Sequence, residues 1–335
     1  MAKRASILLA LVAITGCDSS SPSPTPTPTT SSSSTPTPTP TSSLTPSPSP
    51  TPTAFPVTGE YTFALKYWTE IANTEVGSAG VLPMIPGIIV ADGDRQFIMR
   101  PAAWSVANFG PGPTPFTPTH ANPVTGNEII APRSGTGGGR LTLANNVWPA
   151  EQPADAQYHF TYVNYLRWYY PVGQVNPGRK VYSHLFGFPT ATAGAPGSGT
   201  RAYGSVSSAY IFQTTVTGGL PSSYTIAESD ARGTATVNAN FAARTVTFQL
   251  ILAYYGNGIG TGTVATIDAT GTIASDGVSI DGTLSSTNNV FTGRFKGTLY
   301  GPAGEEIGLV YVLDGSIQGI NPQVQDRIAG AIVGK

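Results

Sequence analysis

The chain has 335 residues, of which 39 are Gly and 30 are Pro, and only 10% are charged. An average globular domain is about 25% charged, so this composition favours β-strands and turns over helices. The net charge is −1, and the absence of a basic patch or a run of like charges argues against nucleic acid and against electrostatic capture of a charged partner.

The first residues have the pattern of an export signal. Lys3 and Arg4 precede an apolar run over residues 5–14, which is too short to span a bilayer. Small residues then lead to Cys17, the only cysteine, so the fold does not depend on an internal disulfide. The sequence ITGC at 14–17 resembles a bacterial lipobox, which implies removal of residues 1–16 and lipidation of Cys17. An ordinary secretory signal with an incidental cysteine is the alternative.

Lipidation would attach the protein to a membrane, because each buried CH₂ of an acyl chain contributes about 0.8 kcal/mol. We expect the outer membrane with exposure at the cell surface, although Asp18 beside the anchor leaves retention at the inner membrane open. The rest of residues 17–54 is almost purely Ser, Thr and Pro, which cannot offset the entropy of ordering. We predict a disordered tether that reaches on the order of 100 Å from the membrane.

Residues 55–196 are predicted to form a β-rich, handle-like domain. The sequence from 55 to about 155 contains no recognisable motif, and Asp92-Gly93-Asp94 predicts a turn because the further acids of a calcium loop are missing. Aromatic residues then gather in the sequence YHFTYVNYLRWYYPVG at 158–173. They are typical first of one face of a half-buried strand, and the alternative is a ligand surface, where aromatic rings with polar tips are common. On the second interpretation the candidate ligand-binding residues are Tyr165, Trp168, Tyr169 and Tyr170.

Residues 197–335 alternate apolar and polar side chains with a period of two, as strands of a half-buried sheet do. In RTVTFQLIL at 244–252, for example, Val246, Phe248, Leu250 and Leu252 share one face, and Ile251 falls among the polar residues of the other. In FTGRFKGTLY at 291–300, Gly293 and Gly297 fall on the apolar face between large side chains. Such alternation fits the narrow interior of a small barrel, and glycine lets strands coil enough to close. We therefore predict a closed antiparallel barrel of about eight strands.

Three motifs in this region carry a resemblance to a known family. FTGRFKGTLYGPAGEEIG at 291–308, GTATVNANFAARTVTF at 233–248 and GSGTRAYGS at 197–205 resemble the barrel signature of the transferrin-binding protein B-subunit superfamily, which includes factor H-binding-like lipoproteins. The third motif departs from the family pattern by placing Arg201 before the alanine. The resemblance implies an all-β fold, with an N-terminal β-rich handle-like region followed by an eight-stranded antiparallel barrel. It also implies a lipid-anchored surface protein. The chain has a single handle–barrel unit, so transferrin itself is not the expected ligand.

The remaining candidate sites point to no catalysis and no cofactor. His120, His159 and His184 lack the spacing of metal ligands, so we predict no metal site. Glu305 and Glu306 have no evident acid–base partner and are expected to accept backbone N–H bonds in their turn. No nucleophile elbow or Ser/His/Asp arrangement is present, and we do not expect an enzyme.

The sequence therefore predicts a surface-exposed bacterial lipoprotein that binds a protein or a small ligand, iron- or haem-containing ligands among them. The alternative is a structural or adhesion module of the cell envelope that has no discrete ligand.

Overall fold

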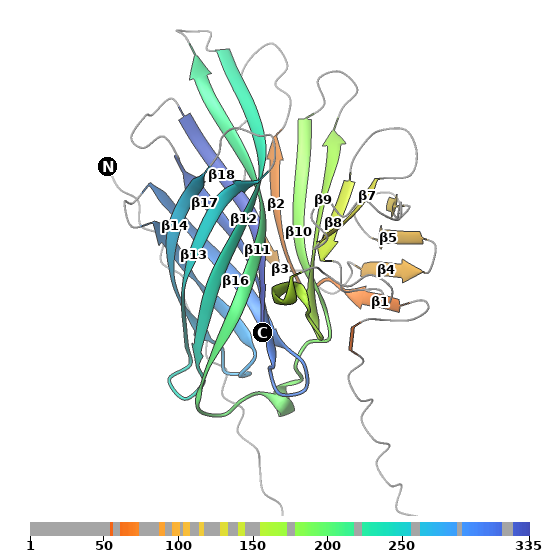
Figure 1. Ribbon diagram of the computed structural model, residues 1–335, viewed down its shortest axis with the longest axis vertical. Helices are drawn as coiled ribbons and strands as arrows, with labels where there is room; N and C mark the ends of the chain where they lie inside the picture. The colour runs from red at the N-terminus through yellow and green to blue at the C-terminus, as the bar shows by residue number, and fades with distance from the viewer. Residues whose placement is uncertain are drawn as a thin grey trace, which may run out of the picture. The chain divides into compact units, whose positions relative to one another are not determined.

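The computed structural model describes residues 54–55, 61–73, 87–90, 96–100, 103–107, 114–116, 128–132, 140–144, 155–172, 178–217, 223–255, 262–286, 290–316 and 324–335. These residues belong to one compact unit, Pro50–Lys335. They form strands and two short 3₁₀ helices, with no α-helix among them, which confirms the predicted all-β fold (Figure 1). Within the described ranges, no helix has the length and apolar character needed to cross a membrane. The predicted signal and tether up to residue 53 lie outside these ranges.

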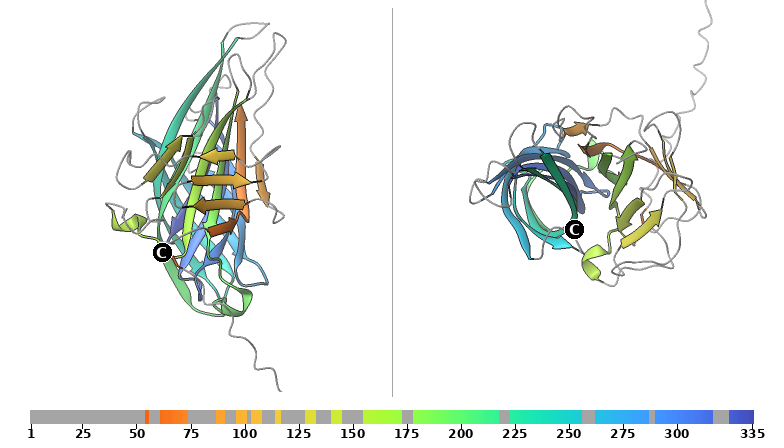
Figure 2. Two further views of the ribbon diagram at one scale, coloured as in Figure 1. Left: turned by 90° about the vertical axis from the view of Figure 1, so that its right-hand side faces the viewer. Right: turned by 90° about the horizontal axis from the view of Figure 1, so that it is seen from above.

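The C-terminal part is a closed antiparallel barrel of eight strands, as the sequence predicts. Each strand pairs with its neighbour in the chain, and β18 returns to pair with β11. Seen from above in Figure 2, these strands form a ring. The strands are β11 (Thr200–Thr217), β12 (Ser223–Asn240), β13 (Thr245–Tyr255), β14 (Thr263–Ile273), β15 (Ser279–Ser286), β16 (Phe291–Tyr300), β17 (Glu306–Gly315) and β18 (Val324–Gly334).

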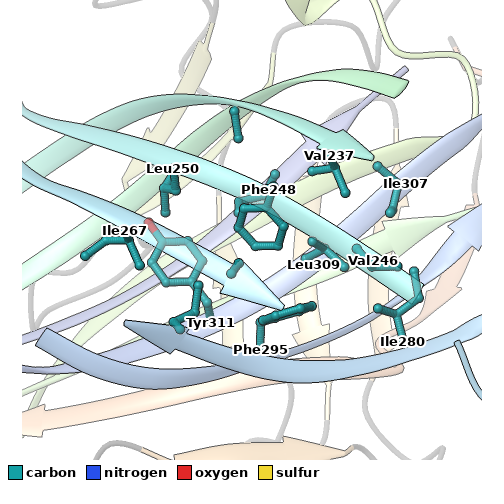
Figure 3. Packing of buried hydrophobic residues seen from close by; sticks show 14 of the residues in the cluster. Val237, Val246, Phe248, Leu250, Ile267, Ile280, Phe295, Ile307, Leu309 and Tyr311 are labelled. Carbon is teal, nitrogen blue, oxygen red and sulfur yellow. The ribbon is translucent and has the colours of Figure 1, made fainter. Parts of the chain in front are cut away.

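Large and small side chains alternate around the barrel interior. Phe295 pairs in register with Gly282 on one side and with Tyr311 on the other. A Cβ atom added at Gly282 would lie 2.5 Å from the Phe295 ring, and one at Gly271 would lie 2.7 Å from it. Phe295 and Tyr311 are both fully buried, and Figure 3 shows them among the aliphatic side chains of the same core. The barrel is filled by its own side chains, with glycines making room for the rings.

Gly293 and Gly297 have a related role. A Cβ atom at either position would collide with a backbone carbonyl of β17, that of Val312 or that of Gly308. The two strands therefore approach more closely here than any larger residue permits. The position of both glycines on the inner face is as predicted, and the reason for each is this close contact of backbones.

The N-terminal part forms two sheets. One has six strands in the order β3-β2-β10-β9-β8-β7 and is called the handle sheet below, and the other has four in the order β1-β4-β5-β6. The strands are β1 (Tyr61–Ala64), β2 (Tyr67–Asn73), β3 (Gly87–Val90), β4 (Gln96–Arg100), β5 (Ala103–Ala107), β6 (Thr114–Phe116), β7 (Glu128–Pro132), β8 (Arg140–Ala144), β9 (Val163–Val172) and β10 (Gly178–Gly187).

Strands β2, β9 and β10 of the handle sheet are buried on both faces. On one face, residues such as Val181 and Leu185 pack against the outside of β11, β17 and β18, including Val310 and Ala331. On the other face lies an aromatic core that includes Phe63 of β1 and residues of the handle sheet such as Phe186. One wall of the barrel is therefore covered by the handle sheet.

Candidate ligand groove

An open groove of about 860 Å³ lies on the outer surface of the barrel. It crosses β11, β12 and β13, and one side is formed by the 3₁₀ helix η1 (Ala156–Tyr158) and by Lys335. Its volume is within the usual range for ligand sites, about 300–1,000 Å³. The groove is lined by Ala156, Gln157, Gly204, Ser205, Thr234, Ala235, Thr236, Asn238, Gln249, Ile251 and Lys335.

Strand alternation sets the chemistry of the groove floor. On β12, Thr234, Thr236 and Asn238 point outward and are exposed, because the residues between them fill the barrel. Thr236 pairs in register with Gly204 of β11, and Thr234 pairs with Ile251 of β13. Ile251 is 46% exposed, and it is the one large hydrophobic residue exposed to this degree among the described residues. The floor is therefore uncharged, with hydroxyl and amide groups next to apolar surface that includes Ile251.

The wall of the groove is held by ionisable side chains. The Asp155 carboxylate accepts a hydrogen bond from the Gln157 backbone N–H at 2.9 Å and so caps η1. The Lys335 ammonium donates to the carbonyls of Ala156 and His159, both at 3.0 Å. Lys335 in turn exchanges backbone hydrogen bonds with Gly204. These contacts join η1 to the barrel at the edge of the groove.

The chain that follows η1 is clamped by Glu306 at the start of β17. Its carboxylate accepts backbone N–H bonds from Thr161, Tyr162 and Val163 at 2.6, 2.7 and 2.8 Å. Burial raises the pKa of Glu306, and the three N–H donors and Lys335 act against that increase. The expectation that both glutamates act within their own turn is correct for Glu305, which accepts from Ala303 N–H at 2.9 Å, and wrong for Glu306. The distance of more than 140 residues between Glu306 and its donors hides this contact from the sequence.

The groove lining offers hydrogen-bonding groups, and it carries no acid–base pair. Gln249 donates from Nε2 to the Asp268 carboxylate at 2.9 Å. Among the described residues, no group of three or more His, Cys, Asp or Glu side chains could hold a metal ion. The arrangement suits non-covalent binding of a ligand.

The structure places two of the predicted ligand-binding aromatics in the interior. Tyr165 is 1% exposed in the core between the handle sheet and the barrel, and Trp168 is 3% exposed in the aromatic core of the handle. Trp168 stacks on Tyr182 with ring centroids 4.8 Å apart. Both residues therefore have the packing role that was the other interpretation of this sequence. Tyr169 and Tyr170 belong to β9, and their side chains lie outside the described part of the structure.

The histidines are in unrelated surroundings. His184 is fully buried and accepts a hydrogen bond at Nε2 from the Trp168 indole N–H at 3.3 Å. His159 is exposed next to η1. His120 and the predicted turn at Asp92–Asp94 lie outside the described ranges.

The sequence gives one signal that could have located the groove. Its lining comes from five segments that are far apart in the chain, and most of its residue types are ordinary for an exposed sheet face. Ile251, however, is an aliphatic residue in the polar register of β13, and this departure from the alternation marks the place.

No protein-family model matches the chain, and no curated protein sequence matches it. The chain is similar to several solved structures of bacterial proteins. One is transferrin-binding protein B from Haemophilus parasuis, with a TM-score of 0.32 and 10% identity, covering 85% of this chain and 78% of that protein. Another is HpuA from Kingella denitrificans in complex with human haemoglobin, with a TM-score of 0.36 and 13% identity, covering 86% of this chain and 91% of that protein.

Isotype 1 transferrin-binding protein B from Neisseria meningitidis is also similar, with a TM-score of 0.41 and 12% identity. That match covers 80% of this chain and 43% of the meningococcal protein, so the chain spans less than half of that relative's length.

Proposed function

We propose that the protein is a lipid-anchored protein of the bacterial cell surface whose folded part binds a ligand non-covalently on the outside of its barrel. The observation that carries this proposal is the combination of a filled barrel interior with an open groove on the barrel's outer surface. The lipobox-like sequence that ends at Cys17 supports the anchor, and the Ser/Thr/Pro-rich stretch after it supports display away from the membrane.

The filled interior supports a ligand site on the outside of the barrel. Eight-stranded barrels either pack their interior with side chains or hold one small ligand there. Here Phe295 and Tyr311, both fully buried, occupy the middle of the barrel together with aliphatic residues (Figure 3). The handle sheet covers the outside of β11, β17 and β18. The groove across β11, β12 and β13 is therefore the surface that we assign to ligand binding.

The nature of the ligand is open to direct test. One of the similar proteins was solved with haemoglobin and others are named for transferrin, so human haemoglobin, transferrin and free haem are natural first probes. Tyr169 and Tyr170 also stay candidate ligand-binding residues, as a proposal separate from the groove.

The test uses the mature full-length chain as bait. We expect host serum or culture medium to yield a partner whose binding saturates. In parallel, titration with haem and with iron salts tests for direct binding of these small ligands. Ile251→Asp places a charge in the groove at an exposed position and should weaken capture. Thr270→Asp, at an exposed position of β14 outside the groove, is the matched control and should not.

If no pool yields a saturable partner, the proposal fails. Loss of envelope integrity on deletion of the gene, with nutrient uptake unchanged, would then favour a structural module. A partner whose capture is equal for Ile251→Asp and the parent chain would keep the binding role but remove it from the groove.

A further inference from the structure

We propose that the groove takes an uncharged, hydroxyl-rich ligand, a neutral oligosaccharide, and this inference rests on the proposed function of the groove. The first argument is electrostatic. Of the lining residues, only Lys335 is charged, and its ammonium already donates to the carbonyls of Ala156 and His159. A carboxylate, phosphate or sulfate group entering the groove would lose water and find a single cation, whose ammonium already donates to two backbone carbonyls, so the groove offers an anion little compensation.

The lining also lacks the features by which proteins recognise peptides. Strand addition needs an exposed sheet edge, and the barrel that forms the floor is closed. Docking of an amphipathic helix needs several large apolar side chains in the groove, whereas Ile251 is the single exposed large hydrophobic residue of this lining. A polyproline ligand needs aromatic walls, and an acidic motif needs a cluster of arginines; the lining residues supply neither.

Sugar hydroxyls fit the groups that are present. A hydroxyl donates one hydrogen bond and accepts two, and side-chain amides both donate and accept. The groove offers the Thr234 and Thr236 hydroxyls together with the amides of Gln157, Asn238 and Gln249. Ile251 supplies one apolar surface on which the C–H face of a sugar ring can lie.

Gly204 has no side chain, so the β11 backbone is exposed in the groove at this position. A Cβ atom added there would find no atom closer than the Lys335 backbone oxygen at 3.9 Å, so a ligand can approach the β11 backbone. Without an aromatic platform we expect weak binding by each groove, made effective at the cell surface by many anchored copies acting together.

The experiment compares ligands on the intact mature chain by saturation-transfer NMR and calorimetry. The probes are maltoheptaose and dextran as neutral saccharides, heparin as a polyanion, and an uncharged peptide built from Gly, Ser and Thr. We expect saturable binding of a neutral saccharide. The double substitution Thr234→Val/Thr236→Val should weaken that binding about tenfold, because two hydrogen bonds are lost while side-chain shape is kept. Thr270→Val, on the same outer face but outside the groove, should leave it unchanged.

The inference is overturned if neither neutral saccharide binds, if heparin or the peptide binds more tightly, or if Thr270→Val has the same effect as the double substitution. Thermal unfolding of each variant shows whether a loss of binding reflects a loss of fold. If a protein partner is captured from serum while all saccharides fail, the proposed binding function stands and only this assignment of ligand class falls.

Discussion

Arg167 of the handle sheet and Asp230 of the barrel form an ion pair, with Nη2 2.9 Å from Oδ1 and side chains 5% and 17% exposed. Arg167 also donates from Nη1 to the Ala209 carbonyl of β11 at 2.6 Å. One guanidinium thus contacts two barrel strands from a position between the handle and the barrel. Such a buried pair contributes little net stability when intact but is costly to break, because one charge is left without its partner.

We therefore expect Arg167→Ala to lower the free energy of unfolding by about 3 kcal/mol. Replacing both partners with uncharged residues of similar shape, Arg167→Met with Asp230→Asn, should cost less than the single change. Urea unfolding of the parent chain and of the two variants measures this. A double variant less stable than Arg167→Ala would contradict the prediction.

Glu306 is the second attachment of the handle to the barrel. Its carboxylate, 3% exposed, serves three backbone N–H groups of Thr161, Tyr162 and Val163. Glu306→Ala leaves these donors without the carboxylate, and because only the Val163 bond is fully buried we expect a loss of about 1–3 kcal/mol, the cost of one buried unsatisfied group. Hydrogen exchange should then accelerate at these three amides first. Unchanged protection there would show that the clamp has no structural role. Glu305→Ala, which removes only a contact within the turn, is the matched control.

The pH dependence of stability follows from the same carboxyl. Burial raises the pKa of Glu306 above its ordinary value of 4.5. Between that value and the higher folded pKa, the folded state binds more protons than the unfolded state, so this group lowers stability as pH rises. The measured quantity is the difference in free energy of unfolding between the parent chain and Glu306→Gln, parent minus variant. This difference should therefore decrease as pH rises from 4.5. It should level off above the folded pKa. A difference that increases over this range would reverse the assigned direction of the shift.

The parts of the fold that are local in sequence could be predicted. The alternation of Val246, Phe248 and Leu250 with polar residues defines the inner face of β13 without any knowledge of its neighbours. Closure was predictable because Gly293 and Gly297 fall in the same register as the large residues of β16. Both inferences use only the period of two that the pleat imposes.

Features that depend on distant contacts could not be predicted. Tyr165 and Trp168 are residue types that binding surfaces also use. They are buried because the handle sheet packs against the barrel on one face and against the aromatic core on the other. The donors to Glu306 come from the segment before β9, and the groove collects residues from five segments. No local pattern encodes these pairings.

The filled interior gives a prediction about glycine. Gly282→Ala would place a methyl group in collision with the Thr270 backbone oxygen and 2.5 Å from the Phe295 ring, so we expect overpacking to cost about 1–3 kcal/mol. Gly204→Ala, where the nearest atom would be 3.9 Å away, should be close to neutral. Thermal unfolding of the two variants is the measurement. If Gly282→Ala and Gly204→Ala lower the unfolding temperature equally, the loss of glycine itself determines the change in stability, and contact with neighbouring atoms does not.

The anchor gives the last prediction. If ITGC at 14–17 is a lipobox, Cys17 is the only thiol available for acylation, since the chain has no other cysteine. Cys17→Ala should abolish incorporation of labelled fatty acid and release the protein from the membrane fraction, because no buried acyl chain then holds it there. Protease treatment of intact cells should digest the parent protein if the folded part is displayed outside. An Asp18→Ser variant tests the sorting signal, and its transfer from inner to outer membrane would show that residue 18 controls the destination. Membrane attachment of Cys17→Ala equal to that of the parent would exclude the lipid anchor.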